Sequence, residues 1–93
     1  MVQHLNGTAL LIVHWRKKQE YIVIRLYQDL VGDWIVSQSR GQLQTSARQT
    51  CLQTIFTSYS EARGLVLSLN KQLRQLGYKT AGITEEQLGF SFE

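Results

Sequence analysis

The chain of 93 residues is long enough for one domain with a single hydrophobic core and too short for two. Hydrophobic residues make up 43% of it and charged residues 18%, which is typical of a soluble globular protein and argues against wholesale disorder. Ten Lys and Arg against seven Asp and Glu give a net charge of +3. This charge is compatible with an anionic partner but does not require one, because chains that bind nucleic acid by charge alone carry a denser basic patch.

Cysteine usage and hydropathy indicate the cellular context. The single cysteine, Cys51, excludes an intramolecular disulfide and a multi-cysteine zinc site, and it favours a reducing compartment. The apolar run at 9–13 is far shorter than the roughly 20 residues that cross a bilayer, and no Lys or Arg precedes it as in a signal peptide. The sequence therefore predicts a cytoplasmic protein without a membrane partner.

Two strands are predicted from the alternation of side-chain types. The first covers Ala9 to Trp15 and, after a charged turn at 16–19, the second covers Tyr21 to Gln28. The apolar side chains that would share one face are Leu11, Val13, Trp15, Ile22, Ile24 and Leu26. Because the other face of the first strand is also largely apolar at its start, this strand is expected in the centre of a sheet or under a cover.

The second strand is predicted to continue into a β-hairpin. A polar break built on Asp29, Gly32 and Asp33 separates it from a further extended segment that starts at Trp34. Glycine and aspartate between two extended segments are typical of a hairpin turn.

A polar stretch and a fourth strand follow the hairpin. Residues 40–50 are interpreted as a loop within a segment that has no acidic residue between Asp33 and Glu61. Long loops in compact domains are often functional. Cys51 to Phe56 is then predicted as a strand, in which Cys51 is expected to be buried as a small hydrophobe.

One long helix is predicted after this strand. Ser58 followed by Glu61 forms a capping box at its start, and Gly77 supplies its stop. Leu67 is expected to be exposed on its polar side. The apolar stripe that would rest on the sheet comprises Ala62, Leu65, Val66, Leu69, Leu73 and Leu76. The opposite side is expected to carry Arg63, Asn70, Lys71 and Arg74.

These elements predict a single α+β domain over residues 1–93, with an antiparallel sheet of about four strands and one main helix packed on one face. Its core is expected at 9–79, with a tail at 80–93 packed on the domain. In the tail, Thr84 with Gln87 is expected to cap a short helical turn. Phe90 and Phe92 are expected to dock on the domain itself, because exposed apolar patches are uncommon on monomers.

The hairpin and helix together resemble a WGR domain, the small module found in poly(ADP-ribose) polymerases and in various bacterial proteins. The resemblance covers roughly residues 10 to 79 and keeps both order and spacing. The residues that carry it are Leu26, Asp29, Leu30, Gly32, Trp34, Gly41, Gln42, Phe56, Ser60, Glu61, Ala62, Gly77 and Tyr78.

The triplet that names this family reads Arg40, Gly41, Gln42 in this chain. In DNA-binding members, the resemblance implies, the Trp of the triplet packs on a sugar at a DNA end and its Arg pairs with phosphate. Arg40 retains a guanidinium that suits phosphate but cannot make the aromatic contact. Gln42 offers neutral donors and loses the ionic interaction.

Two hypotheses for function remain open. The first is binding to the backbone of DNA or another nucleic acid through Arg40, Gln42, Gln44 and Arg48. Tyr21, Arg25 and Tyr27, on the non-core face of the hairpin, would extend this surface by stacking, or would form an ordinary solvated face with cross-strand pairs.

The second hypothesis is a protein-interaction module with apolar anchors at Leu67, Phe90 and Phe92. An enzyme is not expected: the only candidate nucleophile and base are Cys51 with His4 or His14, and no ordering carboxylate accompanies either histidine in a recognisable motif. No metal-ligand spacing and no phosphate-binding glycine loop occurs, so no metal and no cofactor are predicted. The oligomeric state is left open.

Overall fold

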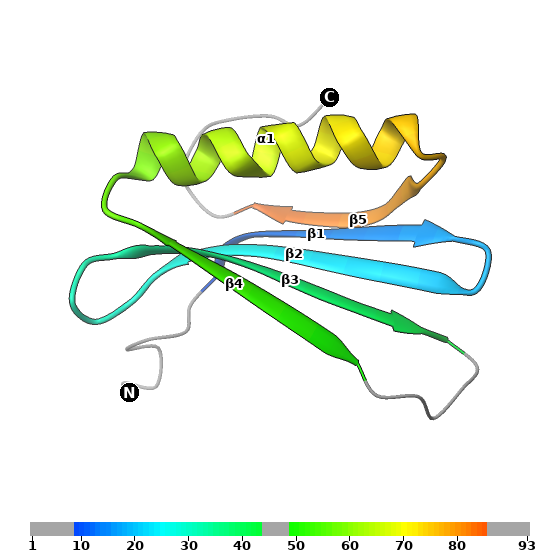
Figure 1. Cartoon of the computed structure of the whole chain (residues 1–93), viewed down its shortest axis with the longest axis horizontal. Helices are drawn as coiled ribbons and strands as arrows, with labels where there is room; N and C mark the ends of the chain where they lie inside the picture. Colours follow the sequence, from blue (N-terminus) through cyan, green and yellow to red (C-terminus); the bar gives the residue numbers. More distant parts are fainter. Residues whose placement is uncertain (1–8, 44–48, 86–93) are drawn as a thin grey trace.

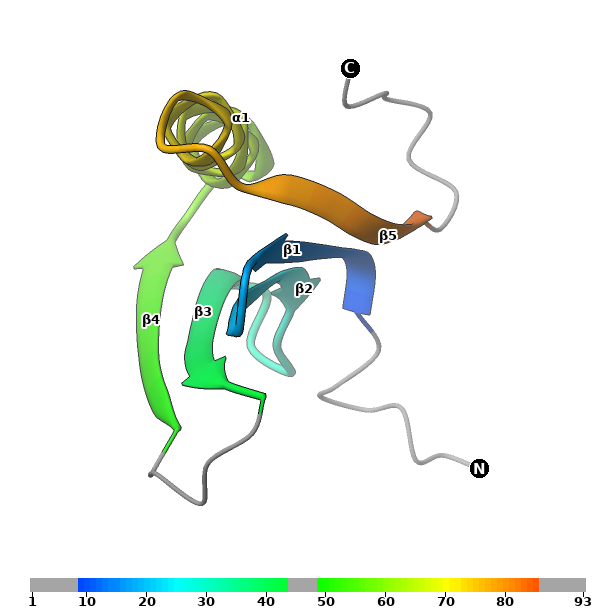
Figure 2. The same ribbon diagram turned by 90° about the vertical axis from the view of Figure 1, so that its right-hand side faces the viewer.

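A five-stranded antiparallel sheet carries one helix on one of its faces in the computed structural model of the chain (Figure 1; turned by 90° in Figure 2). The structure describes residues 9–43 and 49–85. Its elements are β1 (Ala9–Lys17), β2 (Glu20–Gln28), β3 (Trp34–Gln42), β4 (Thr50–Phe56), α1 (Tyr59–Gln75) and β5 (Lys79–Glu85). The strand order β4-β3-β2-β1-β5 confirms the predicted α+β class.

The fifth strand is a correction to the sequence prediction. Lys79–Glu85 pairs with β1 along the edge of the sheet, so the segment after residue 79 is part of the sheet and not only a tail. Thr84 lies in this strand and does not begin a helical turn; Gln87, Phe90 and Phe92 lie outside the described residues. β1 lies between β2 and β5, as expected for a central strand.

Strand register sets the two faces of the sheet. Val13 lies opposite Ile24, and Leu26 lies opposite Val36, so the predicted apolar faces of β1 and β2 meet and extend into β3. The buried core toward α1 comprises Leu11, Val13, Trp15, Ile22, Ile24, Leu26, Val36, Ala62, Val66 and Leu73. Burying side chains of this size stabilises the fold by roughly 1.5–3 kcal/mol for each large one, before chain entropy is subtracted.

The turn between β2 and β3 is held by the side chain of Asp29. Its Oδ1 accepts hydrogen bonds from the backbone N–H of Val31 at 3.1 Å and of Asp33 at 2.9 Å. Gly32 adopts a φ of +94°, a conformation that favours glycine. The predicted hairpin is therefore confirmed, and local chemistry explains its turn.

Both ends of α1 are capped as the sequence predicts. Ser58 Oγ accepts the N–H of Glu61 at 3.2 Å. At the other end, Gly77 has a φ of +96°, and the N–H of Tyr78 donates to the carbonyl of Leu73 at 2.9 Å, which is the Schellman arrangement. Lys17 Nζ from β1 donates to the carbonyl of Leu76 at 2.7 Å and so fixes the helix end to the sheet.

Two positions on α1 correct the predicted stripe. Asn70, expected on the polar side, is only 3% exposed, because it lies four residues after Val66 and three before Leu73 on the line that faces the sheet. Leu76, expected in the stripe, is 56% exposed, because it lies at the C-cap where the helix ends. Leu67 is exposed, as expected.

Aromatic side chains pack at both ends of the contact between α1 and the sheet. Trp34 of β3 packs edge-on against Tyr59 at a centroid distance of 5.0 Å. Trp15 of β1 is buried beneath the guanidinium of Arg74, which lies 5.6 Å from its ring centroid. Within the described part of the chain, no helix is long and apolar enough to cross a membrane.

Candidate nucleic-acid interface

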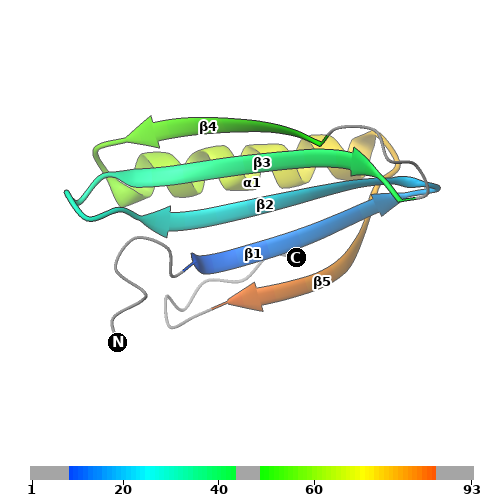
Figure 3. The ribbon, with the colours of Figure 1, turned by 90° about the horizontal axis from the view of Figure 1, so that it is seen from below.

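No other described element covers the face of the sheet turned away from α1, here called the open face, and Figure 3 shows it in front of the helix. Four residues of this face are nevertheless buried: Val23, Ile35, Ser37 and Ser39. Strand register places Arg16, Arg25 and Lys79 on this face, together with His14. Among residues 11–17, 20–28, 34–42, 50–56 and 79–83 of the strands, the register places no Asp or Glu on this face, because Glu20 lies opposite Lys17 on the side of α1. The open face is therefore basic.

Tyr21 lies flat on this basic face. It is directly opposite Gly41, where a Cβ would lie 2.5 Å from the Tyr21 hydroxyl oxygen and 2.6 Å from Cζ. The absence of a side chain at Gly41 thus lets the ring rest on the backbone of β3. Its hydroxyl accepts a hydrogen bond from Gln49 Nε2 at 3.2 Å, which orients the ring toward β4.

Tyr27, farther along β2, is also held by a glutamine side chain. Its hydroxyl accepts a hydrogen bond from Gln53 Nε2 of β4 at 3.1 Å. Both tyrosines are half-buried, and Arg25 lies between them on the same face of the strand. The cross-strand pairs expected of a solvated face are therefore present, and they hold two aromatic rings beside a guanidinium.

A hollow of about 260 Å³ opens on the same face near Tyr21. His14 and Arg16 from β1, Val23 from β2 and Leu43 after β3 line it with the tyrosine. A cation, an imidazole and an aromatic ring thus surround an apolar floor. Such a hollow suits a flat group with an anion attached.

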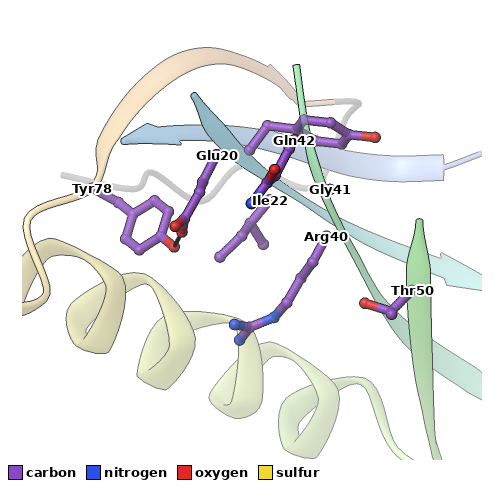
Figure 4. Close-up of a pocket in the computed structure, with 8 residues that line it drawn as sticks. Glu20, Ile22, Arg40, Gly41, Gln42, Thr50 and Tyr78 are labelled. Atoms are coloured by element: carbon purple, nitrogen blue, oxygen red, sulfur yellow. Dashed lines mark hydrogen bonds between the residues drawn. The ribbon is translucent and has the colours of Figure 1, made fainter. Parts of the chain in front are cut away.

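Arg40 and Gln42 lie on the other side of the sheet. The predicted loop was expected to start at Arg40, but β3 continues to Gln42, and Arg40 is opposite Ile22 on the face toward α1. Figure 4 shows the Arg40 side chain extending toward α1 in a cavity of about 320 Å³. Glu20, Gln42, Thr50 and Tyr78 also line this cavity.

Tyr78 and Glu20 form a fixed pair in this cavity. The tyrosine hydroxyl donates to Glu20 Oε1 at 2.7 Å, shown by the dashed line in Figure 4. The pKa of Tyr78 is raised above its ordinary value of 10.0, first because of this hydrogen bond and then because of burial and the charge of Glu20; the charge of Arg40 opposes the rise. The cavity therefore contains one acidic side chain beside Arg40, unlike the open face.

The residues predicted to bind nucleic acid thus divide between two surfaces. Arg25 and Tyr27 lie on the open face, Arg40 and Gln42 lie on the helix side, and Tyr21 lines both hollows. Gln44 and Arg48 lie outside the described residues, as do Phe90 and Phe92. Leu67 is exposed on α1, away from the open face.

Cys51 corrects another expectation, because it is exposed and not buried. It lies on β4, which pairs with β3 alone among the described strands and so forms an edge of the sheet. Its Sγ is 3.6 Å from Ser37 Oγ and 3.8 Å from Ser39 Oγ. Among residues 9–43 and 49–85, no three His, Cys, Asp or Glu side chains are grouped so that they could hold a metal ion.

Sequence reasoning did not assign His14, Arg16 or Lys79 to the interface. The alternation of side chains along β1 places His14 and Arg16 on the face opposite the core residues Val13 and Trp15. The sequence alone could therefore have indicated these two residues. Lys79 joins the face only through the pairing of β5 with β1, which the sequence did not indicate. Comparison of the chain with protein-family models, with curated proteins and with solved structures finds no match.

Proposed function

We propose that this protein is a nucleic-acid-binding module that holds a single strand across the open face of its sheet. The observation that carries the proposal is a face with Arg16, Arg25 and Lys79, two anchored tyrosines and no acidic residue among residues 11–17, 20–28, 34–42, 50–56 and 79–83. Cations attract the phosphate backbone and aromatic rings stack on unpaired bases. Neither contact requires a particular base sequence.

The spacing of the two rings favours a single strand over a duplex. Tyr21 and Tyr27 are six residues apart on β2, which corresponds to about 20 Å along the strand. Stacking on both rings requires bases that are free of their partners. Arg25 lies between the rings, where the phosphates of a strand that bridges them would pass.

The resemblance to a WGR domain offers a second surface for the same class of ligand. This resemblance implies that Arg40, on the helix side of the sheet, would bind phosphate. Glu20 lines that cavity, and its charge repels phosphate, whereas the open face has no such side chain among the same strand residues. For this reason we assign the ligand to the open face.

Fluorescence anisotropy with a labelled single strand of about 12 nucleotides tests the proposal. Tyr27→Leu should weaken binding by about 5- to 150-fold, because stacking contributes about 1–3 kcal/mol per base. Tyr27→Phe is the matched control: it keeps the ring, removes only the hydroxyl that Gln53 contacts, and should bind nearly as well as the native protein. Arg25→Ala should reduce the salt slope by about one between roughly 50 and 200 mM salt.

Three results would count against this assignment. One is the absence of binding to single-stranded DNA and RNA at low salt. Another is a Tyr27→Leu variant that binds as the native protein does. The third is a loss of binding in Arg40→Ala together with unchanged binding in Tyr27→Leu, which would move the ligand to the WGR-like surface.

A further inference from the structure

The outer edge of the sheet at β4 is unusually suited to pairing with another strand. Its seven residues, Thr50–Phe56, contain no charge, no glycine and no proline. Leu52 is 60% exposed on the helix side and Ile55 is 62% exposed on the open side. An edge strand of this kind presents unpaired backbone N–H and C=O groups beside apolar side chains, and so acts as a template for a further strand.

The opposite edge, β5, carries the features that discourage such pairing. Its register with β1 shifts between His14 and Trp15, it contains Gly82, and Lys79 places a charge at its start. Bulges and charged residues are common protections of edge strands. β4 has neither a charge nor a register shift against β3. Of the two edge strands, β4 is therefore the one that can pair with a further strand.

We infer that β4 pairs antiparallel with β4 of a second copy of this chain. A two-fold axis at Gln53 would bring Cys51 opposite Ile55 of the other copy, Leu52 opposite Thr54 and Thr50 opposite Phe56. Every exposed apolar side chain of the strand then gains a neighbour, and no like charges meet. A neutral strand that complements itself in this way fits the isologous interface of a two-fold dimer.

Pairing of β4 strands would join the two sheets into one of ten strands. The open faces would become continuous, and the tyrosine-anchoring Gln53 of each copy would lie at the seam. A single strand pair covers less surface than a stable dimer interface, so the association is weak and depends on concentration. The pairing of two β4 strands does not depend on whether nucleic acid is the ligand.

Analytical ultracentrifugation over roughly a hundredfold range of protein concentration tests this inference. The native chain should shift from monomer to dimer as the concentration rises. Gln53→Lys and Gln53→Glu each place like charges face to face at the two-fold axis, and each should raise the dimer Kd by up to about fivefold. An equimolar mixture of the two variants should restore dimer formation, because Lys then faces Glu.

The matched control is Thr80→Lys, which adds a charge at an exposed position on β5 and should leave dimer formation unchanged. Circular dichroism establishes that each variant keeps its fold. A chain that stays monomeric at the highest concentration overturns the inference. So does a dimer that both Gln53 variants preserve, a dimer that only Thr80→Lys disrupts, or a mixture that fails to associate.

Discussion

Replacement of Asn70 by leucine should make the protein more stable. Asn70 is 3% exposed on the line of α1 that faces the sheet, and its Nδ2 and Oδ1 have no hydrogen-bond partner among the described residues. A buried amide without partners costs about 1–3 kcal/mol. Leucine has the same branched arrangement of side-chain heavy atoms, belongs among the surrounding core side chains and has a helix propensity better by a few tenths of a kcal/mol.

The free energy of unfolding of Asn70→Leu should therefore rise by about 1–3 kcal/mol, measured by urea denaturation. For a chain of this length, each kcal/mol corresponds to about 4–8 °C in Tm. Ser68→Leu, at an exposed position of the same helix, is the control for helix propensity and should change stability by less than about 0.5 kcal/mol. Asn70→Asp should destabilise the fold, because it buries a charge.

An Asn70→Leu variant that is less stable than the native protein would refute this reasoning. It would mean that the amide is paired, for example through buried water, and that the pairing exceeds the cost of burial. Equal gains from Asn70→Leu and Ser68→Leu would also refute it, because the effect would then come from helix propensity alone.

Two further predictions concern the end of α1 and the cavity beside it. Gly77→Ala should lower the free energy of unfolding by about 1–2 kcal/mol in urea denaturation, because a side chain is strained at a φ of +96°; an unchanged midpoint would contradict the Schellman cap. Glu20→Gln should lower the pKa of Tyr78 toward 10.0, as followed by tyrosinate absorbance with Tyr78→Phe as the reference, because it removes the charged acceptor. Since the folded-state pKa is raised, the stability that this pair contributes is complete below pH 10 and is lost as the pH rises through the folded-state pKa; a Tyr78 pKa that Glu20→Gln leaves in place would contradict the assignment.

The elements that the sequence predicts well are those governed by local chemistry. Ser58 and Gly77 mark the ends of α1 because caps act within one turn. Asp29 and Gly32 mark the hairpin because an aspartate that bonds its own turn and a glycine with positive φ act within four residues. Neither signal needs the rest of the fold.

The features that were missed depend on distant parts of the chain. β5 contains Ala81 and Gly82, which are poor strand formers, and it is extended because β1 offers it a partner. Asn70 was placed on the polar side by its chemistry, although its spacing from Val66 places it on the buried line. Cys51 was expected to be buried because of its residue type, whereas its place on an edge strand exposes it.

The placement of Arg40 and Arg25 on opposite faces was also not predicted from the sequence. Arg40 and Arg25 share one surface only if Arg40 is placed in a loop. Once β3 reaches Gln42, alternation assigns Arg40 to the face of Ile22 and leaves Arg25 on the opposite face. Ending β3 a few residues too early in the prediction thus placed Arg40 with the residues of the wrong face of the sheet.

The sheet order has a consequence for the order of folding. β1 to β4 form a meander in which every strand pairs with its neighbour in sequence, so loop-closure entropy is low for each step. β5 instead closes on β1 across the whole length of the meander and the helix. Contacts this distant in sequence form slowly. During synthesis, β1 therefore remains an unprotected edge until the chain beyond Lys79 has emerged, and the finished sheet depends on the last strand to cover the first.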